Sequence, residues 1–157
     1  MRKMLRHVLA VLALGFVFGR ASIAAQNPPG PVDDTVTFAA GEVCAFGLEL
    51  SLSGKSKTIE LPGNRLIMTS PGLDATVTNL SNASKRVTLN ITGAFHQTTT
   101  PEGNVVTVST GRSLLFDPVA GFVLVMGRFS FVFNAAGELI QPLQGRGQTI
   151  DVCALIS

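Results

Sequence analysis

Apolar and polar residues alternate with a period of two through much of the chain after residue 34. The pattern is clear at residues 44–52, at residues 86–92 and around Phe129, Phe131 and Phe133. A β-strand places successive side chains on opposite faces, so this period predicts strands with one buried face. After residue 25, no stretch of useful length has the 3.6-residue period of an amphipathic helix. We therefore expect an all-β chain.

Short segments rich in Gly, Pro, Asn and Asp separate the alternating runs. Their spacing of about 8–12 residues predicts one antiparallel β-sandwich or β-barrel domain of about nine to eleven strands over residues 35–157. Turns are expected at residues 53–55, 62–64, 71–72, 81–82, 101–104, 117–118 and 134–137. The apolar run at 119–126, interrupted only by Gly121, predicts a strand buried on both faces, with a short helix as the alternative.

Two glycine-containing segments match nucleotide-binding motifs only in part. Residues 54–56 (GKS) match the end of a phosphate-binding loop, but Glu49 stands where its first glycine belongs. Residues 145–147 (GRG) match the start of a dinucleotide fingerprint, but Ile150 stands where its third glycine belongs. Both segments are therefore expected to be turns between strands.

Residues 1–25 have the composition of a secretory signal peptide. A basic start precedes an apolar run at residues 8–19, and small residues before Gln26 offer a cleavage site. The run is shorter than the roughly 20 residues of a spanning helix, and no second stretch after it is long enough either. We expect a cleaved signal peptide and an exported protein, with an uncleaved anchor as the alternative. Residues 26–34 (QNPPGPVDD) predict a Pro-rich, flexible leader.

Removal of the signal peptide changes the charge balance. The chain has 12 Lys+Arg against 10 Asp+Glu, and Arg2, Lys3, Arg6 and Arg20 lie in the signal peptide, which holds no acid. Cleavage leaves 8 basic residues against the same 10 acidic residues. This balance gives no reason to expect a nucleic-acid or polybasic membrane partner. The chain also has no Trp or Tyr, the usual platforms on which sugars stack.

Cys44 and Cys153 are the only cysteines. An even number of cysteines in an exported protein predicts a disulfide. The alternatives are two free thiols or a metal site. A metal site needs three or four ligands, and His96 is the only further His or Cys after residue 25. Cys44 shares an alternating face with Phe46 and Leu48, so we expect the bridge at the core, joining the second strand to the last. No metal site and no cofactor are expected.

Few side chains could support catalysis. His96 is the only histidine after residue 25, and the chain has no Gly-x-Ser-x-Gly nucleophile motif. Asp151 lies two residues before Cys153, on the same strand face, and two roles are open for it: an inward-pointing side chain, or a partner for an Arg or for backbone N–H groups. A polar site would be built from His96, Arg112, Asp117 and Asp151, with no residue assigned a catalytic role.

Several short segments resemble those of a group of small secreted bacterial proteins with two cysteines. They are Cys44–Phe46, Thr76–Asn79, Asn90–His96, Thr110–Arg112 and Asp151–Leu155. The resemblance extends over nearly all of the chain after the signal peptide. It implies export and a two-cysteine β domain. The group has no assigned activity, so the resemblance implies no substrate.

These observations favour a secreted, non-catalytic β domain. It would bind an extracellular protein, a component of the cell envelope or a small ligand, with the turns at 101–104 and 117–121 as expected contact points. One alternative is a calycin-like barrel that carries a small apolar ligand inside a lumen lined by Phe. The other alternative is an enzyme centred on His96.

Overall fold

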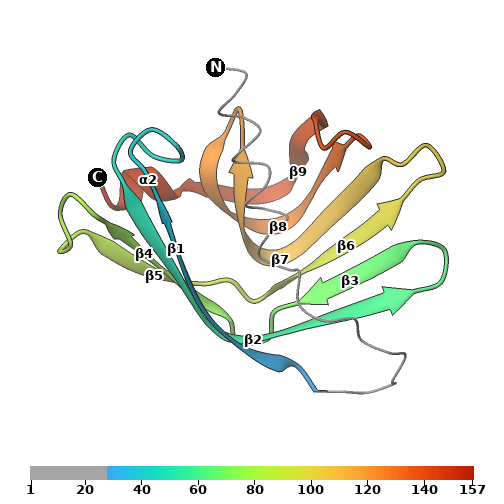
Figure 1. The fold of residues 1–157 in the computed structure, drawn as a ribbon, viewed down its shortest axis with the longest axis horizontal. Helices are drawn as coiled ribbons and strands as arrows, with labels where there is room; N and C mark the ends of the chain where they lie inside the picture. The colour runs from blue at the N-terminus through green and yellow to red at the C-terminus, as the bar shows by residue number, and fades with distance from the viewer. Residues whose placement is uncertain (1–27) are drawn as a thin grey trace.

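The structure, a computed structural model, describes residues 28–157, which form nine antiparallel strands and a short C-terminal helix (Figure 1). The elements are β1 (Gly30–Phe38), β2 (Leu48–Leu61), β3 (Arg65–Thr69), β4 (Asp74–Asn79), β5 (Arg86–Asn90), β6 (Gly93–Thr99), β7 (Val105–Asp117), β8 (Gly121–Phe133), β9 (Leu139–Asp151) and α2 (Val152–Leu155). The predicted all-β class is confirmed, with a strand number at the lower end of the expected range. The predicted signal peptide, residues 1–25, lies outside the described residues.

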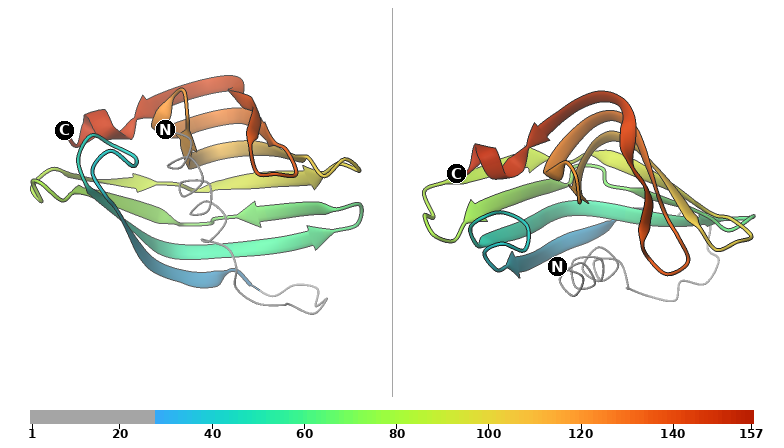
Figure 2. Two further views of the ribbon diagram at one scale, coloured as in Figure 1. Left: turned by 45° about the horizontal axis from the view of Figure 1, so that its top comes forward. Right: turned by 90° about the horizontal axis from the view of Figure 1, so that it is seen from above.

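The strands form one sheet in the order β5-β4-β2-β3-β6-β7-β8-β9, with β1 added beside the first half of β2. β3 and β4 pair with the two halves of β2, and they are separated by a break at residues 70–73. A second break, at residues 91–92, separates β5 from β6. β6 pairs with β7 and β5 does not, so β5 and β6 diverge at this break. The sheet stays open and is not closed into a barrel (Figures 1 and 2). The chain therefore forms one bent, open antiparallel sheet.

A line of glycines crosses four neighbouring strands, and we call it the glycine row. Gly93 lies opposite Gly111, Gly111 opposite Gly127, and Gly127 opposite Gly147. A Cβ atom on Gly127 would overlap the carbonyl oxygen of Arg146, and one on Gly147 would overlap that of Met126. Backbones this close admit only glycine. The strands arch across this region, as the right view of Figure 2 shows.

Two of the expected turns are strand interiors instead. Gly54 lies within β2, where a Cβ atom would overlap the carbonyl oxygen of Gly72. Residues 145–147 lie within β9, beside the glycine row. In both cases glycine allows close approach of two backbones inside the sheet rather than a reversal of the chain. The remaining expected turns lie between strands, except that Asp117 is the last residue of β7.

The first strand begins earlier than the sequence predicts. β1 starts at Gly30, so residues 30–34 of the predicted leader pair with β2. Pro31 lacks an N–H group, but β1 is an edge strand, where proline is tolerated. Residues 30–34 are therefore part of the sheet.

Apolar side chains gather in two clusters. The first cluster lies between the half-sheet of β1, β2, β4 and β5 on one side and β8 with α2 on the other. Its buried members are Phe38, Cys44, Leu48, Val77, Leu89, Phe122, Leu124, Val152 and Ile156. The second cluster consists of Leu115, Val123, Val125 and Phe129, with Phe95, Phe131 and Leu143 packed against them.

The start of β8 takes part in both clusters. Phe122 and Leu124 belong to the first cluster, whereas Val123 and Val125 belong to the second, and none of these four side chains is more than 3% exposed. The predicted strand buried on both faces is therefore confirmed from Phe122 onward. Val119, at the start of the predicted run, instead lies in the β7–β8 turn and is 85% exposed.

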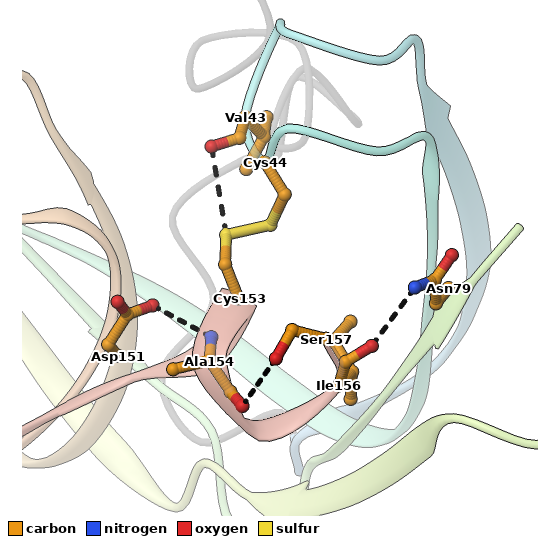
Figure 3. Close-up of a disulfide and its surroundings, with 8 residues drawn as sticks. All are labelled: Val43, Cys44, Asn79, Asp151, Cys153, Ala154, Ile156 and Ser157. Carbon is orange, nitrogen blue, oxygen red and sulfur yellow. Dashed lines mark hydrogen bonds between the residues drawn. A yellow bond between two sulfur atoms is a disulfide. The ribbon is translucent and has the colours of Figure 1, made fainter. Parts of the chain in front are cut away.

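Cys44 and Cys153 form the predicted disulfide, with their Cα atoms 5.6 Å apart (Figure 3). Cys44 is buried, as expected, but it lies in the loop between β1 and β2 rather than in a strand. The loop turns at Gly41, whose N–H donates to the carbonyl of Cys44 at 2.8 Å, and this local bond ends the strand pattern. Cys153 lies in α2, after β9. The bridge therefore ties the loop before β2 to the helix that follows the last strand.

Candidate functional site

The structure does not place His96 beside an acidic residue of its sheet. His96 is exposed on β6, and its cross-strand neighbours are Ile67 on β3 and Val108 on β7. Directly opposed side chains are the closest ones on a sheet face. His96 therefore lies between two aliphatic side chains.

Both candidate aspartates form hydrogen bonds to backbone N–H groups. Asp117 is 9% exposed and accepts from the N–H groups of Val119 at 2.8 Å, Ala120 at 2.7 Å and Leu143 at 3.1 Å. Asp151 is the N-cap residue of α2 and accepts from the N–H of Ala154 at 3.2 Å (Figure 3). Asp151 is exposed rather than inward-pointing, and of its two expected roles the structure shows the second, a partner for a backbone N–H group. An Asp directly before a helix is a known capping signal.

Arg112, the fourth candidate, is exposed on β7 directly after Gly111. Its partner across the sheet is Met126 on β8, not one of the other candidates. His96, Arg112, Asp117 and Asp151 are thus distributed over β6, the second half of β7 and the end of β9. None of the four lies opposite another in the register of the sheet.

The two turns expected to make contacts differ in character. The turn at residues 101–104 is polar, and the Thr100 hydroxyl, together with the N–H of Glu102 itself, lowers the pKa of the Glu102 carboxyl. The turn after Asp117 presents the apolar Val119. Beside it, a pocket of about 20 Å³ opens between Leu115, Phe131, Leu139 and Leu143. A volume of that size holds about one water molecule.

Polar atoms inside the described part of the chain are satisfied. Among residues 28–157, each buried side-chain nitrogen or oxygen has a hydrogen-bond partner. The same residues contain no group of three or more His, Cys, Asp or Glu side chains arranged to hold a metal ion. They also contain no helix that is long and apolar enough to cross a membrane.

A set of residues on one face of the six strands β2, β3, β6, β7, β8 and β9 contributes to neither cluster, and we call it the outer face. The register places its residues in three rows that cross these strands in that order. The rows are Lys57, Thr69, Ala94, Thr110, Arg128 and Arg146; Ile59, Ile67, His96, Val108, Ser130 and Gln144; and Leu61, Arg65, Thr98, Val106, Val132 and Gln141.

The outer face lies on the outside of the arch. Phe129 and Phe131 on β8 alternate with Arg128 and Ser130, so the two pairs lie on opposite faces of the strand. The phenylalanines pack in the second cluster, together with residues from the other side of the glycine row. The strands therefore bend toward the second cluster, and the outer face is the convex side.

Charge and apolar surface combine on the outer face. Its basic side chains are Lys57, Arg65, Arg128 and Arg146, and no Asp or Glu occupies any of its positions. Its aliphatic side chains (Ile59, Leu61, Ile67, Val106, Val108 and Val132) are half-buried, and none belongs to either core cluster. The composition of the chain as a whole conceals this one-sided distribution, because acidic residues lie elsewhere.

Arg128 on β8 and Arg146 on β9 lie directly opposite each other. Both side chains are exposed. Like charges in directly opposed positions destabilise a sheet. The residues before and after this pair, Gly127 with Gly147 and Phe129 with Gly145, provide no carboxylate to offset the repulsion. The sheet thus carries an unfavourable charge pair beside the glycine row.

Comparison of the chain with protein-family models, with curated proteins and with solved structures found no match. The resemblance to small secreted bacterial proteins therefore stays a resemblance. The chain is a small β-rich protein whose two cysteines form a disulfide.

Proposed function

We propose that the protein is a secreted, non-catalytic binding domain and that its outer face is the binding surface. The observation that carries this proposal is the opposed pair Arg128 and Arg146 on a face without acidic residues. Arrangements that lower the stability of a sheet, such as opposed like charges, are expected at functional positions, where a bound partner offsets the loss of stability. An anionic group bound between the two guanidinium groups would supply that compensation.

The hydrogen bonds of the candidate polar residues favour binding over catalysis. Asp117 and Asp151 accept backbone N–H groups that fix a turn and a helix end. The residues opposite His96 in the two neighbouring strands are aliphatic. They offer no hydrogen-bond partner of the kind that orients a general base. The signal peptide expected at residues 1–25 supports an extracellular or cell-envelope location.

A sedimentation experiment with bacterial envelope fragments tests the proposal. The chain, purified as processed by the expressing cell, is compared with Arg128→Thr/Arg146→Thr. Threonine retains a high β-propensity at both positions. The matched control is Lys85→Thr/Arg86→Thr, which removes the same charge from exposed residues at the start of β5.

We expect the unmodified chain and the control to sediment with the fragments, and the outer-face variant to stay in solution. Equal sedimentation of all three proteins would contradict the proposal. Hydrolysis of an ester, glycoside or peptide substrate that disappears in His96→Ala would contradict its non-catalytic part.

A further inference from the structure

The chemistry of the outer face points to one class of partner, and this step rests on the proposed function. We infer that the outer face binds a lipid surface with anionic headgroups. The partner has to interact favourably with two kinds of side chain at once: exposed guanidinium groups and the half-buried aliphatic side chains beside them. An anionic lipid surface offers phosphates to the first and the boundary of the acyl chains to the second.

The extent of the face suits a partner with an extended surface. Six strands at a spacing of about 4.8 Å give the face a width of about 24 Å between β2 and β9. The basic row ends in Arg128 and Arg146 and runs parallel to the row of Ile59, Ile67 and Val108. Cations and aliphatic side chains thus alternate over the same surface instead of occupying separate ends. A single small anion would engage the arginines and leave the aliphatic row in water.

The position of the aromatic residues argues against a polysaccharide as the partner. Phe95, Phe129 and Phe131 point to the opposite face, where they pack in the second cluster. The outer face therefore offers no Phe, Tyr or Trp ring on which a sugar could stack. Its apolar residues are branched aliphatics, which contribute burial of methyl groups rather than directional contacts.

The negative balance of charge left after signal cleavage does not oppose this partner. Screening limits the reach of exposed charges to about 10 Å at 0.1 M salt, so a surface senses mainly the face that touches it. Asp33, Asp34 and Glu49, three of the ten acidic residues, lie on β1 and the first half of β2, outside the outer face. The charged side chains that the outer face presents to a lipid surface are therefore all cationic.

Vesicle sedimentation tests the inference. The processed chain is mixed with vesicles of phosphatidylcholine alone and with vesicles that contain phosphatidylglycerol in addition. We expect binding to the anionic vesicles that weakens as salt is raised from 0.05 to 0.5 M. One basic residue near such a surface contributes roughly fivefold, so Arg128→Thr/Arg146→Thr should bind about 25-fold more weakly. Lys85→Thr/Arg86→Thr should bind as the unmodified chain does.

A second variant tests the aliphatic part. Val108→Thr/Val132→Thr retains shape and charge and replaces two methyl groups by hydroxyl groups. Loss of one buried methyl group costs roughly fourfold in affinity, so about 16-fold weaker binding to anionic vesicles is expected. Melting temperatures of all variants, measured in parallel, establish that each one is folded.

The outcomes separate this inference from the proposed function. Equal vesicle binding by the outer-face variant and the control would overturn the inference. Binding to a soluble anionic polysaccharide and to envelope fragments, but not to vesicles, would also overturn it and leave the proposed function standing. Envelope binding that is insensitive to Arg128→Thr/Arg146→Thr would overturn both.

Discussion

The carboxylate of Asp117, at the end of β7, accepts a hydrogen bond from the backbone N–H of Leu143, in the middle of β9. The two residues are 26 positions apart, and the other oxygen of Asp117 binds the N–H groups of Val119 and Ala120. One side chain thus holds the β7–β8 turn and connects the two sides of the arch. This relationship assigns Asp117 a structural role.

Replacement of Asp117 should destabilise the fold without affecting the outer face. Asp117→Ala leaves three backbone donors without this acceptor, and hydrogen bonds to a charged group contribute about 1.5–3 kcal/mol. We expect a loss of about 2–3 kcal/mol in the free energy of unfolding, measured by urea denaturation. Asp117→Asn retains one acceptor oxygen and should lose less. An unchanged urea midpoint in Asp117→Ala would contradict the role.

Alanine in the glycine row should be poorly tolerated. In Gly127→Ala the new methyl group overlaps the carbonyl of Arg146, and the residue has a φ of 142°. Such overlap forces backbone shifts, so we expect a loss of at least about 2 kcal/mol. Gly30→Ala is the matched control, because no atom lies within 4 Å of its Cβ position. Equal thermal stability of the two variants would contradict the proposed close approach of the strands.

The glycines also define the limit of what the sequence could predict about the fold. Alternation at Phe129, Phe131 and Phe133 correctly predicts a strand, because it depends on local geometry alone. Gly54 and residues 145–147 have the local composition of turns, yet they lie within β2 and β9. What distinguishes the two cases is the approach of another strand, which no local pattern contains.

Loss of the disulfide should be strongly destabilising. The bridge closes a loop of 109 positions, and removing a native disulfide from a small domain typically costs 2–5 kcal/mol. Cys44→Ser/Cys153→Ser should therefore melt well below the oxidised chain, as measured by calorimetry. Addition of a reductant should bring the two proteins to the same melting temperature. A difference that persists under reducing conditions would show that the substitutions act through packing, since Cys44 is 5% exposed.

The helix cap offers a finer test. Asp151→Ala removes the acceptor for the N–H of Ala154 and should cost about 1 kcal/mol, typical of a lost N-cap. Asp151→Asn caps a helix about as well and should be nearly neutral. The comparison is made by denaturant unfolding. If both variants lost the same stability, the charge of Asp151 rather than its capping bond would be the cause.

The candidate site was less accessible to sequence reasoning than the fold. Residue type alone groups the four candidates, His96, Arg112, Asp117 and Asp151. Their positions depend on the register of strands that are distant in the sequence. The opposed pair Arg128 and Arg146 depends on the length of the β8–β9 turn and on an irregularity in the pairing between Ser130 and Phe133. Neither quantity follows from hydrophobic alternation. The pair therefore emerges only from the paired sheet.

The substitution Arg146→Glu tests the central claim most directly, because it changes stability and binding in opposite directions. It replaces a repulsive pair with an attractive one opposite Arg128, and such cross-strand pairs contribute about 0.2–1 kcal/mol. We predict a higher melting temperature together with a large loss of binding to anionic vesicles, measured on the same sample. A lower melting temperature with unchanged vesicle binding would contradict the account.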